Sequence, residues 1–167
     1  MPTRFNVSGP LTVPVRQGHA AKTITSDNVK QFWARHPDAG KHRGCYLFAI
    51  RAGRGLPPAY VGRATKTFKQ EVFASDKRAR YQQVLADYRK GAPVLFFIVA
   101  PRQTGKPNTQ HIRELERFLI QVAAAANPAL LNIMGTKSEQ WSVAGVLRSG
   151  QGKRSYAAAS LIKALKL

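Results

Sequence analysis

Residues 44–64 read GCYLFAIRAGRGLPPAYVGRA, and the rest of the chain is organised around this stretch. Its two apolar runs, 45–50 (CYLFAI) and 59–64 (AYVGRA), are rich in aromatic and aliphatic residues, which predicts two strands. The segment between them contains two glycines and a pair of prolines, which cannot continue a strand. Each strand carries a tyrosine close to a glycine, Tyr46 and Tyr60. Such a tyrosine either packs in the core with its hydroxyl on one partner, or takes part in chemistry.

Length and composition predict one folded domain over residues 1–167. The chain is 44% hydrophobic and includes two Trp, enough for a real core. No run approaches the roughly 18 apolar residues of a membrane span, and the amino terminus lacks the apolar segment of a secretory signal. The single cysteine cannot form an internal disulfide, so nothing requires an oxidising compartment. We therefore expect a cytoplasmic protein that does not bind membranes.

Charge is the strongest signal in the composition. The chain has 27 Lys and Arg against 8 Asp and Glu, a formal net charge of +19. This excess destabilises the compact state by self-repulsion unless a polyanion shares the surface, and nucleic acid is the natural partner. The basic residues are dispersed, which favours a basic face on a folded domain, with an unpartnered basic surface as the alternative. Because no acidic cluster occurs in the sequence, any metal chemistry is expected to use one ion.

The remaining chain predicts further helices and strands from its apolar periodicity and its helix breakers. The unbroken apolar run at 94–100 (VLFFIVA) predicts a central strand covered on both faces. Weaker strand patterns occur at 5–7, 11–15 and 141–147. Helices are expected at 28–35, 65–74, 76–90, from about 109 to about 126, and at 156–166.

The helix ending near residue 126 places one carboxylate among apolar side chains. At about 100° per residue, one broad arc of this helix carries Ile112, Leu115, Phe118, Leu119, Ile120, Val122 and Ala123. Glu116 falls inside that arc, whereas Glu114 falls on the opposite side. A carboxylate facing the core is costly unless it is paired or bound to a metal. The sequence leaves two interpretations open, a salt bridge to an arginine or a metal ligand.

Four motifs occur in the order that a known family of nucleases uses. They are Gly44-Cys-Tyr46, Tyr60-Val-Gly62, Leu115-Glu116 and Asn132, and together they resemble the GIY-YIG nuclease family. Cys and Val replace the Ile of the two tripeptides. The resemblance covers residues 44–134, with an amino-terminal arm at 1–43 and a strand-helix extension at 135–167 packed on this core. It implies an α+β fold with a small, mainly antiparallel, three-stranded central sheet flanked by helices.

The resemblance also implies a metal-dependent DNA endonuclease that uses one Mg²⁺ or Mn²⁺ and no small-molecule cofactor. Glu116 would be the only protein carboxylate on the metal, while Tyr46 and Tyr60 would line the scissile phosphate. Tyr46 is favoured as the general base, and Arg63 is expected to lie near enough to Tyr60 to stabilise a phenolate. Asn132 would orient this group of side chains.

One departure from the family concerns its arginine on the helix after the second tyrosine. That position is Gln70 here, so Lys69 is the expected substitute, with Arg78 or Arg80 next if the helix is displaced. Two alternatives remain, a DNA-binding module that does not cut and a basic RNA-binding protein. The oligomeric state, monomer or homodimer, stays open. The residues expected to contact nucleic acid are Arg63, Lys66, Lys69, Arg78, Arg80, Lys153 and Arg154.

Overall fold

The computed structural model describes residues 3–105, 108–131, 144, 146 and 152–165. The chain divides into two compact units, Met1–Ile133 and Met134–Leu167, and each is described by itself. Asn132 lies outside the described residues, as does the strand predicted at 141–147 except for residues 144 and 146. The roles assigned to this part of the chain therefore stay predictions.

The predicted α+β class is confirmed, and most predicted elements form close to their expected positions. The helix predicted at 65–74 is only one turn long, and the Thr67 hydroxyl caps it by accepting a hydrogen bond from the Gln70 amide. In chain order the elements are β1 (Asn6–Thr12), α1 (Ser26–Arg35), the 3-10 turn η1 (Ala39–Lys41), β2 (Gly44–Arg51), β3 (Pro58–Ala64), α2 (Phe68–Glu71), α3 (Ser75–Asp87), β4 (Ala92–Val99), α4 (Gln110–Ala126) and α5 (Tyr156–Leu165).

The sheet of the described residues has four strands instead of the three expected. Its order is β1-β4-β2-β3, and all three neighbouring pairs are antiparallel. The added strand is β1, which pairs with β4 from Asn6 opposite Val99 to Thr12 opposite Val94. This pairing satisfies backbone groups along one side of an apolar strand that would otherwise be an exposed edge. At the opposite side, β3 is the edge strand.

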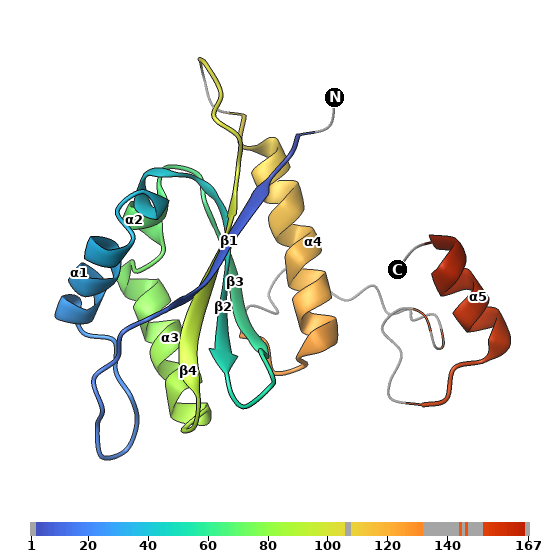
Figure 1. Ribbon diagram of the computed structural model, residues 1–167, viewed down its shortest axis with the longest axis horizontal. Helices are drawn as coiled ribbons and strands as arrows, with labels where there is room; N and C mark the ends of the chain where they lie inside the picture. Colours follow the sequence, from blue (N-terminus) through green and yellow to red (C-terminus); the bar gives the residue numbers. More distant parts are fainter. Residues whose placement is uncertain (1–2, 106–107, 132–143, 145, 147–151, 166–167) are drawn as a thin grey trace. The chain divides into compact units, whose positions relative to one another are not determined.

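Successive side chains of a strand point to opposite faces of the sheet, and directly paired residues of antiparallel strands point to the same face. The pairing of the strands therefore shows which side chains share a face. Tyr46 is paired with Gly62 and Phe48 with Tyr60, so both tyrosines lie on one face. Helices α1, α2 and α3 lie on that side of the sheet, and α4 lies on the other (Figure 1). The first face is packed with aromatic rings, whereas a smaller apolar cluster joins the second face to α4 through Val61, Ile120, Ala123 and Leu130.

Helix α4 buries a narrower stripe than its sequence pattern predicts. Ile112, Ile120 and Ala123 are buried, but Phe118 is 60% exposed and Val122 is 50% exposed. The prediction that the last two face the core is therefore wrong. Periodicity gives the direction of the apolar arc, but the width that is buried depends on the surface against which the helix packs.

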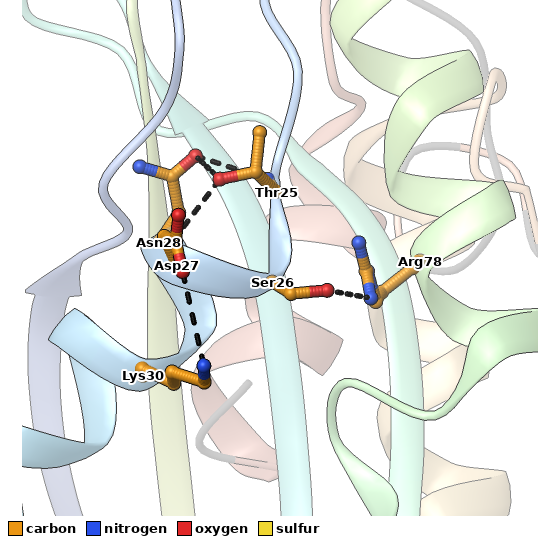
Figure 2. A network of polar contacts seen from close by, with 6 residues as sticks. All are labelled: Thr25, Ser26, Asp27, Asn28, Lys30 and Arg78. Carbon is orange, nitrogen blue, oxygen red and sulfur yellow. Dashed lines mark hydrogen bonds and ion pairs between the residues drawn. The ribbon is translucent and has the colours of Figure 1, made fainter.

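Helix α1 is fixed at its start by a capping box and by a side chain from α3 (Figure 2). The Thr25 hydroxyl accepts a hydrogen bond from the Asn28 amide, and the Asn28 side chain accepts one from the Thr25 amide. The Arg78 guanidinium donates to the carbonyl oxygen of Ile24 at 3.1 Å and to the Ser26 hydroxyl at 3.4 Å. Arg78, predicted to contact DNA, thus has a structural role in joining α3 to α1.

The second unit is described mainly through α5 and the residues just before it. Lys153 and Arg154 are exposed there, as a contact with nucleic acid would require. None of the helices in the described parts of the chain is long and apolar enough to cross a membrane.

Candidate functional site

Tyr46 and Tyr60 form an aromatic pair on the face of the sheet that α3 covers. Their ring centroids are 6.2 Å apart and both side chains are buried. The ring of Tyr46 crosses from β2 onto β3 at Gly62, where a Cβ atom would lie only 2.4 Å from both the Cζ atom and the hydroxyl oxygen of Tyr46. Glycine at this position therefore lets the Tyr46 hydroxyl reach the edge strand.

The Tyr46 hydroxyl completes no hydrogen bond with a described residue, although it is fully buried. The neighbouring phenol of Tyr81 is satisfied, because it donates to the carbonyl oxygen of Val72 at 2.8 Å. Burial raises the pKa of Tyr46 well above its usual value, the electrostatic interaction with Tyr60 raises it further, and the nearby Tyr81 hydroxyl lowers it. Tyr46 is therefore a neutral phenol with an unused donor, and buried polar groups without partners are uncommon in native proteins.

Two cations of α3 lie over the ring of Tyr60. The Lys77 ammonium is 5.9 Å and the Arg80 guanidinium carbon is 5.5 Å from the ring centroid. Burial lowers the pKa of Lys77, but its hydrogen bond to Asp76 and its proximity to Tyr60 raise it above its usual value, so the ammonium stays charged. Arg80 is among the predicted DNA contacts, and Lys77, which opens the same basic run at the start of this helix, lies beside it. The i, i+3 spacing of the two residues on one helix is the signal that places them together.

Arg63 and Glu116 form an ion pair on the other face of the sheet. Arg63 is paired with Cys45 across the strands and so faces α4, which carries Glu116. The Glu116 side chain is 15% exposed and that of Arg63 is 43% exposed. The prediction of a largely buried carboxylate is confirmed, and so is the alternative of a salt bridge to an arginine. The structure does not bring Arg63 to Tyr60 as expected, and Lys77 and Arg80 lie there instead.

The two tyrosines and Glu116 thus approach the sheet from opposite faces. They meet only at the edge strand, where the Tyr46 hydroxyl lies against Gly62 from one side and Glu116 binds the next residue, Arg63, from the other. No further strand of the described residues covers this edge. The structure therefore places Tyr46 on one side of the segment Gly62-Arg63 and Glu116 on the other. These side chains do not line one enclosed pocket.

Glu116 is the residue of this region that fits a divalent cation. The described residues contain no group of three or more His, Cys, Asp or Glu side chains that could hold a metal. Mg²⁺, however, keeps several of its waters and uses one or two carboxylates together with substrate phosphates. The Glu116 carboxylate already has a cation as its partner, the Arg63 guanidinium. A single carboxylate fits one ion completed by water and phosphate, provided that the Arg63 guanidinium moves aside or shares Glu116.

Cys45 lies beneath this ion pair as a buried, neutral thiol. Its Sγ atom donates to the carbonyl oxygen of Ile112 at 3.3 Å. Burial raises the pKa of Cys45 to about 12, the charge of Glu116 raises it as well, and that of Arg63 lowers it. Because only the thiolate binds metals well, Cys45 does not add a ligand to Glu116 at neutral pH.

We expect the free energy of unfolding to decrease above pH 9 because of Cys45. Its pKa rises from 9.0 in the unfolded chain to about 12 in the folded one, so its contribution is complete below pH 9 and is lost toward pH 12. Between these values the loss is about 1.4 kcal/mol per pH unit. Urea titrations of the wild type and of Cys45→Val at pH 8, 9 and 10 measure it. Parallel decreases of the two proteins between pH 9 and 10 would contradict the assignment.

Lys69, the expected substitute for the family arginine, lines a groove to which the tyrosine pair does not contribute. This open groove has a volume of about 820 Å³, and Trp33, Gly40 and Lys41 also line it. Lys66 is exposed in the loop before α2. Arg80 and Lys77 are the cations that lie over the ring of Tyr60 in the first unit's described residues, in place of the expected Lys69.

Comparison with models of protein families, with curated proteins and with solved structures finds no match to this chain. The class that the structure defines is an α+β protein with a four-stranded antiparallel sheet.

Proposed function

We propose that this chain is a metal-dependent DNA endonuclease of the GIY-YIG type. The observation that carries the proposal is the Tyr46 hydroxyl, which is buried without a partner at Gly62, one residue from the Arg63–Glu116 ion pair. A phosphate oxygen would engage a buried donor that has no partner, and a metal ion would engage a carboxylate. Both border the same edge strand of the sheet, β3.

DNA is the partner that the charge of the chain favours. A formal charge of +19 binds a polyanion through release of counterions. Lys77 and Arg80 over the ring of Tyr60 supply positive charge on one side of the edge strand, and Arg63 supplies it at the edge itself. A phosphodiester at this edge would therefore meet cations from two directions.

The proposed roles divide between the two faces of the sheet. A bound metal ion would polarise the phosphate and stabilise the leaving oxygen, and Glu116 would hold it. Tyr46 would donate its hydroxyl proton to a phosphate oxygen, because burial keeps this phenol neutral before DNA binds. Acting as the general base would require Tyr46 to lose that proton once the complex forms. Tyr60 would position the phosphate between Tyr46 and the two cations of α3.

We expect Tyr46→Phe to stabilise the protein and to abolish cleavage. Removing a buried hydroxyl that has no partner removes a desolvation cost of about 1–3 kcal/mol, so unfolding should require more energy. The same hydroxyl is needed at the phosphate, so nicking of supercoiled plasmid in Mg²⁺ should fall by at least about 100-fold. Plasmid binding in a gel shift should remain unchanged. Wild-type cleavage by this variant would remove Tyr46 from the mechanism.

The plasmid assay also separates the alternative functions. A wild-type protein that shifts duplex DNA and never cuts it would be a nuclease-like binding module. One that prefers structured RNA to duplex DNA and cuts neither would be an RNA-binding protein. Either result would overturn the endonuclease proposal.

A further inference from the structure

The Arg63–Glu116 ion pair differs from the other ion pairs between described residues. Those three join neighbours in sequence, Asp27 with Lys30, Asp38 with Lys41 and Asp76 with Lys77, and their carboxylates are 62% to 92% exposed. Arg63 and Glu116 are 53 residues apart, and the carboxylate is only 15% exposed. This pair is therefore a tertiary contact between β3 and α4 that removes a carboxylate from water.

The Glu116 carboxylate cannot bind a guanidinium and a divalent cation with full strength at the same time. Like charges repel at short range, and the repulsion is stronger where water is partly excluded. A metal ion at Glu116 must either displace the Arg63 guanidinium or bind more weakly in its presence.

We propose that Arg63 competes with the divalent cation for Glu116, and that a DNA phosphate relieves the competition by drawing Arg63 away. This inference rests on the proposed function, because it takes Glu116 as the metal ligand. It makes Arg63 a positioning residue that links metal binding to DNA binding. The link is reciprocal, so DNA would raise the affinity for metal by the same factor as metal raises the affinity for DNA.

Arg63 is placed so that it can leave Glu116 without disturbing the core. Its side chain is 43% exposed, and it lies on the edge strand, where the sheet ends in the described residues. The preceding residue, Gly62, is the one that the Tyr46 hydroxyl contacts. A phosphate drawn to that hydroxyl would thus arrive beside the guanidinium, which binds phosphate well through its planar fork of donors.

Titration of the DNA-free full chain with Mn²⁺, followed by the electron paramagnetic resonance of the free ion, tests the competition. Arg63→Gln should bind Mn²⁺ about tenfold more tightly than the wild type, because Glu116 loses its competing cation. Arg63→Lys should fall between the two, since a lysine pairs with a carboxylate as a point charge only. Arg117→Gln is the matched control, since it makes the same change at an exposed position beside Glu116 and should bind as the wild type does.

A short duplex with phosphorothioate linkages extends the test to DNA. It should raise the Mn²⁺ affinity of the wild type by a larger factor than that of Arg63→Gln, because only the wild type has an arginine to draw away. Equal factors would overturn the proposed link to DNA.

The outcomes distinguish this inference from the proposed function. If Glu116→Gln binds Mn²⁺ as the wild type does, Glu116 is not the ligand, and both the metal site and the inference fail. If Glu116→Gln loses binding while folded Arg63→Gln and Arg63→Lys match the wild type, only the competition fails. Circular dichroism checks that each variant is folded, and Arg63→Lys provides the result if Arg63→Gln is not.

Discussion

Glu116→Gln is expected to reduce plasmid cleavage in Mg²⁺ by at least about 1,000-fold, which corresponds to about 4 kcal/mol of transition-state stabilisation. Glutamine keeps the size of the side chain and an oxygen that can accept from Arg63, but it lacks the charge that holds a divalent cation. The fold should survive, because Arg63 is partly exposed and water can solvate it. Single-turnover rates measure the effect, and gel shifts measure DNA binding separately.

Glu114→Gln is the matched control for this experiment. Glu114 lies two residues before Glu116, on the opposite and exposed side of α4, where it accepts a hydrogen bond from Gln110 at 2.8 Å. The same loss of one negative charge should leave cleavage unchanged. Full activity of Glu116→Gln would show that this carboxylate holds no metal that the reaction needs, and would end the proposed mechanism.

Gly62→Ala is expected to destabilise the protein by about 3 kcal/mol, since overpacking a dense core usually costs 1–3 kcal/mol and sometimes more. The new methyl group would lie 2.4 Å from the Tyr46 ring. That ring is fully buried and also packs near Phe68, with centroids 6.5 Å apart, so it has little room to move. The midpoint of thermal unfolding should fall by roughly 6–12 °C for a chain of this size.

Two further variants establish the cause of that loss. Gly55→Ala, in the loop between β2 and β3, meets only ordinary contacts at 3.5 and 3.7 Å and should change stability little. Tyr46→Ala in the Gly62→Ala background should recover part of the loss, because the clashing ring is gone. Strictly additive effects of the two substitutions would mean that Gly62 is not constrained by Tyr46.

The hairpin at the centre of the fold could be predicted because its signals are local. Alternating aromatic and aliphatic residues, interrupted by Gly and Pro, define β2 and β3 within a few residues of their observed bounds. The helical periodicity of the sequence likewise predicted that Glu116 is partly buried. The ion-pair partner of Glu116 could not be predicted in this way, since no local rule selects Arg63 from the 27 basic residues.

Predictions that depend on tertiary packing were less accurate. The weak patterns at 5–7 and 11–15 became one strand, β1, because pairing with β4 supplies hydrogen bonds that local propensity does not reveal. The distance in sequence from Tyr60 predicts Lys69 at the site, but α2 is only one turn long and Lys69 lines another groove. The cations beside Tyr60 come instead from α3.

The pairing of β1 with β4 also bears on which part of the chain can exist alone. The resemblance to nucleases begins at residue 44, so a shortened chain starting there would lack Asn6–Thr12. Strand β4, with the sequence APVLFFIV, would then present an unpaired and very apolar border to other molecules. Such borders add strands from neighbouring chains and lead to aggregation. The amino-terminal strand thus protects the sheet from association through the apolar strand β4.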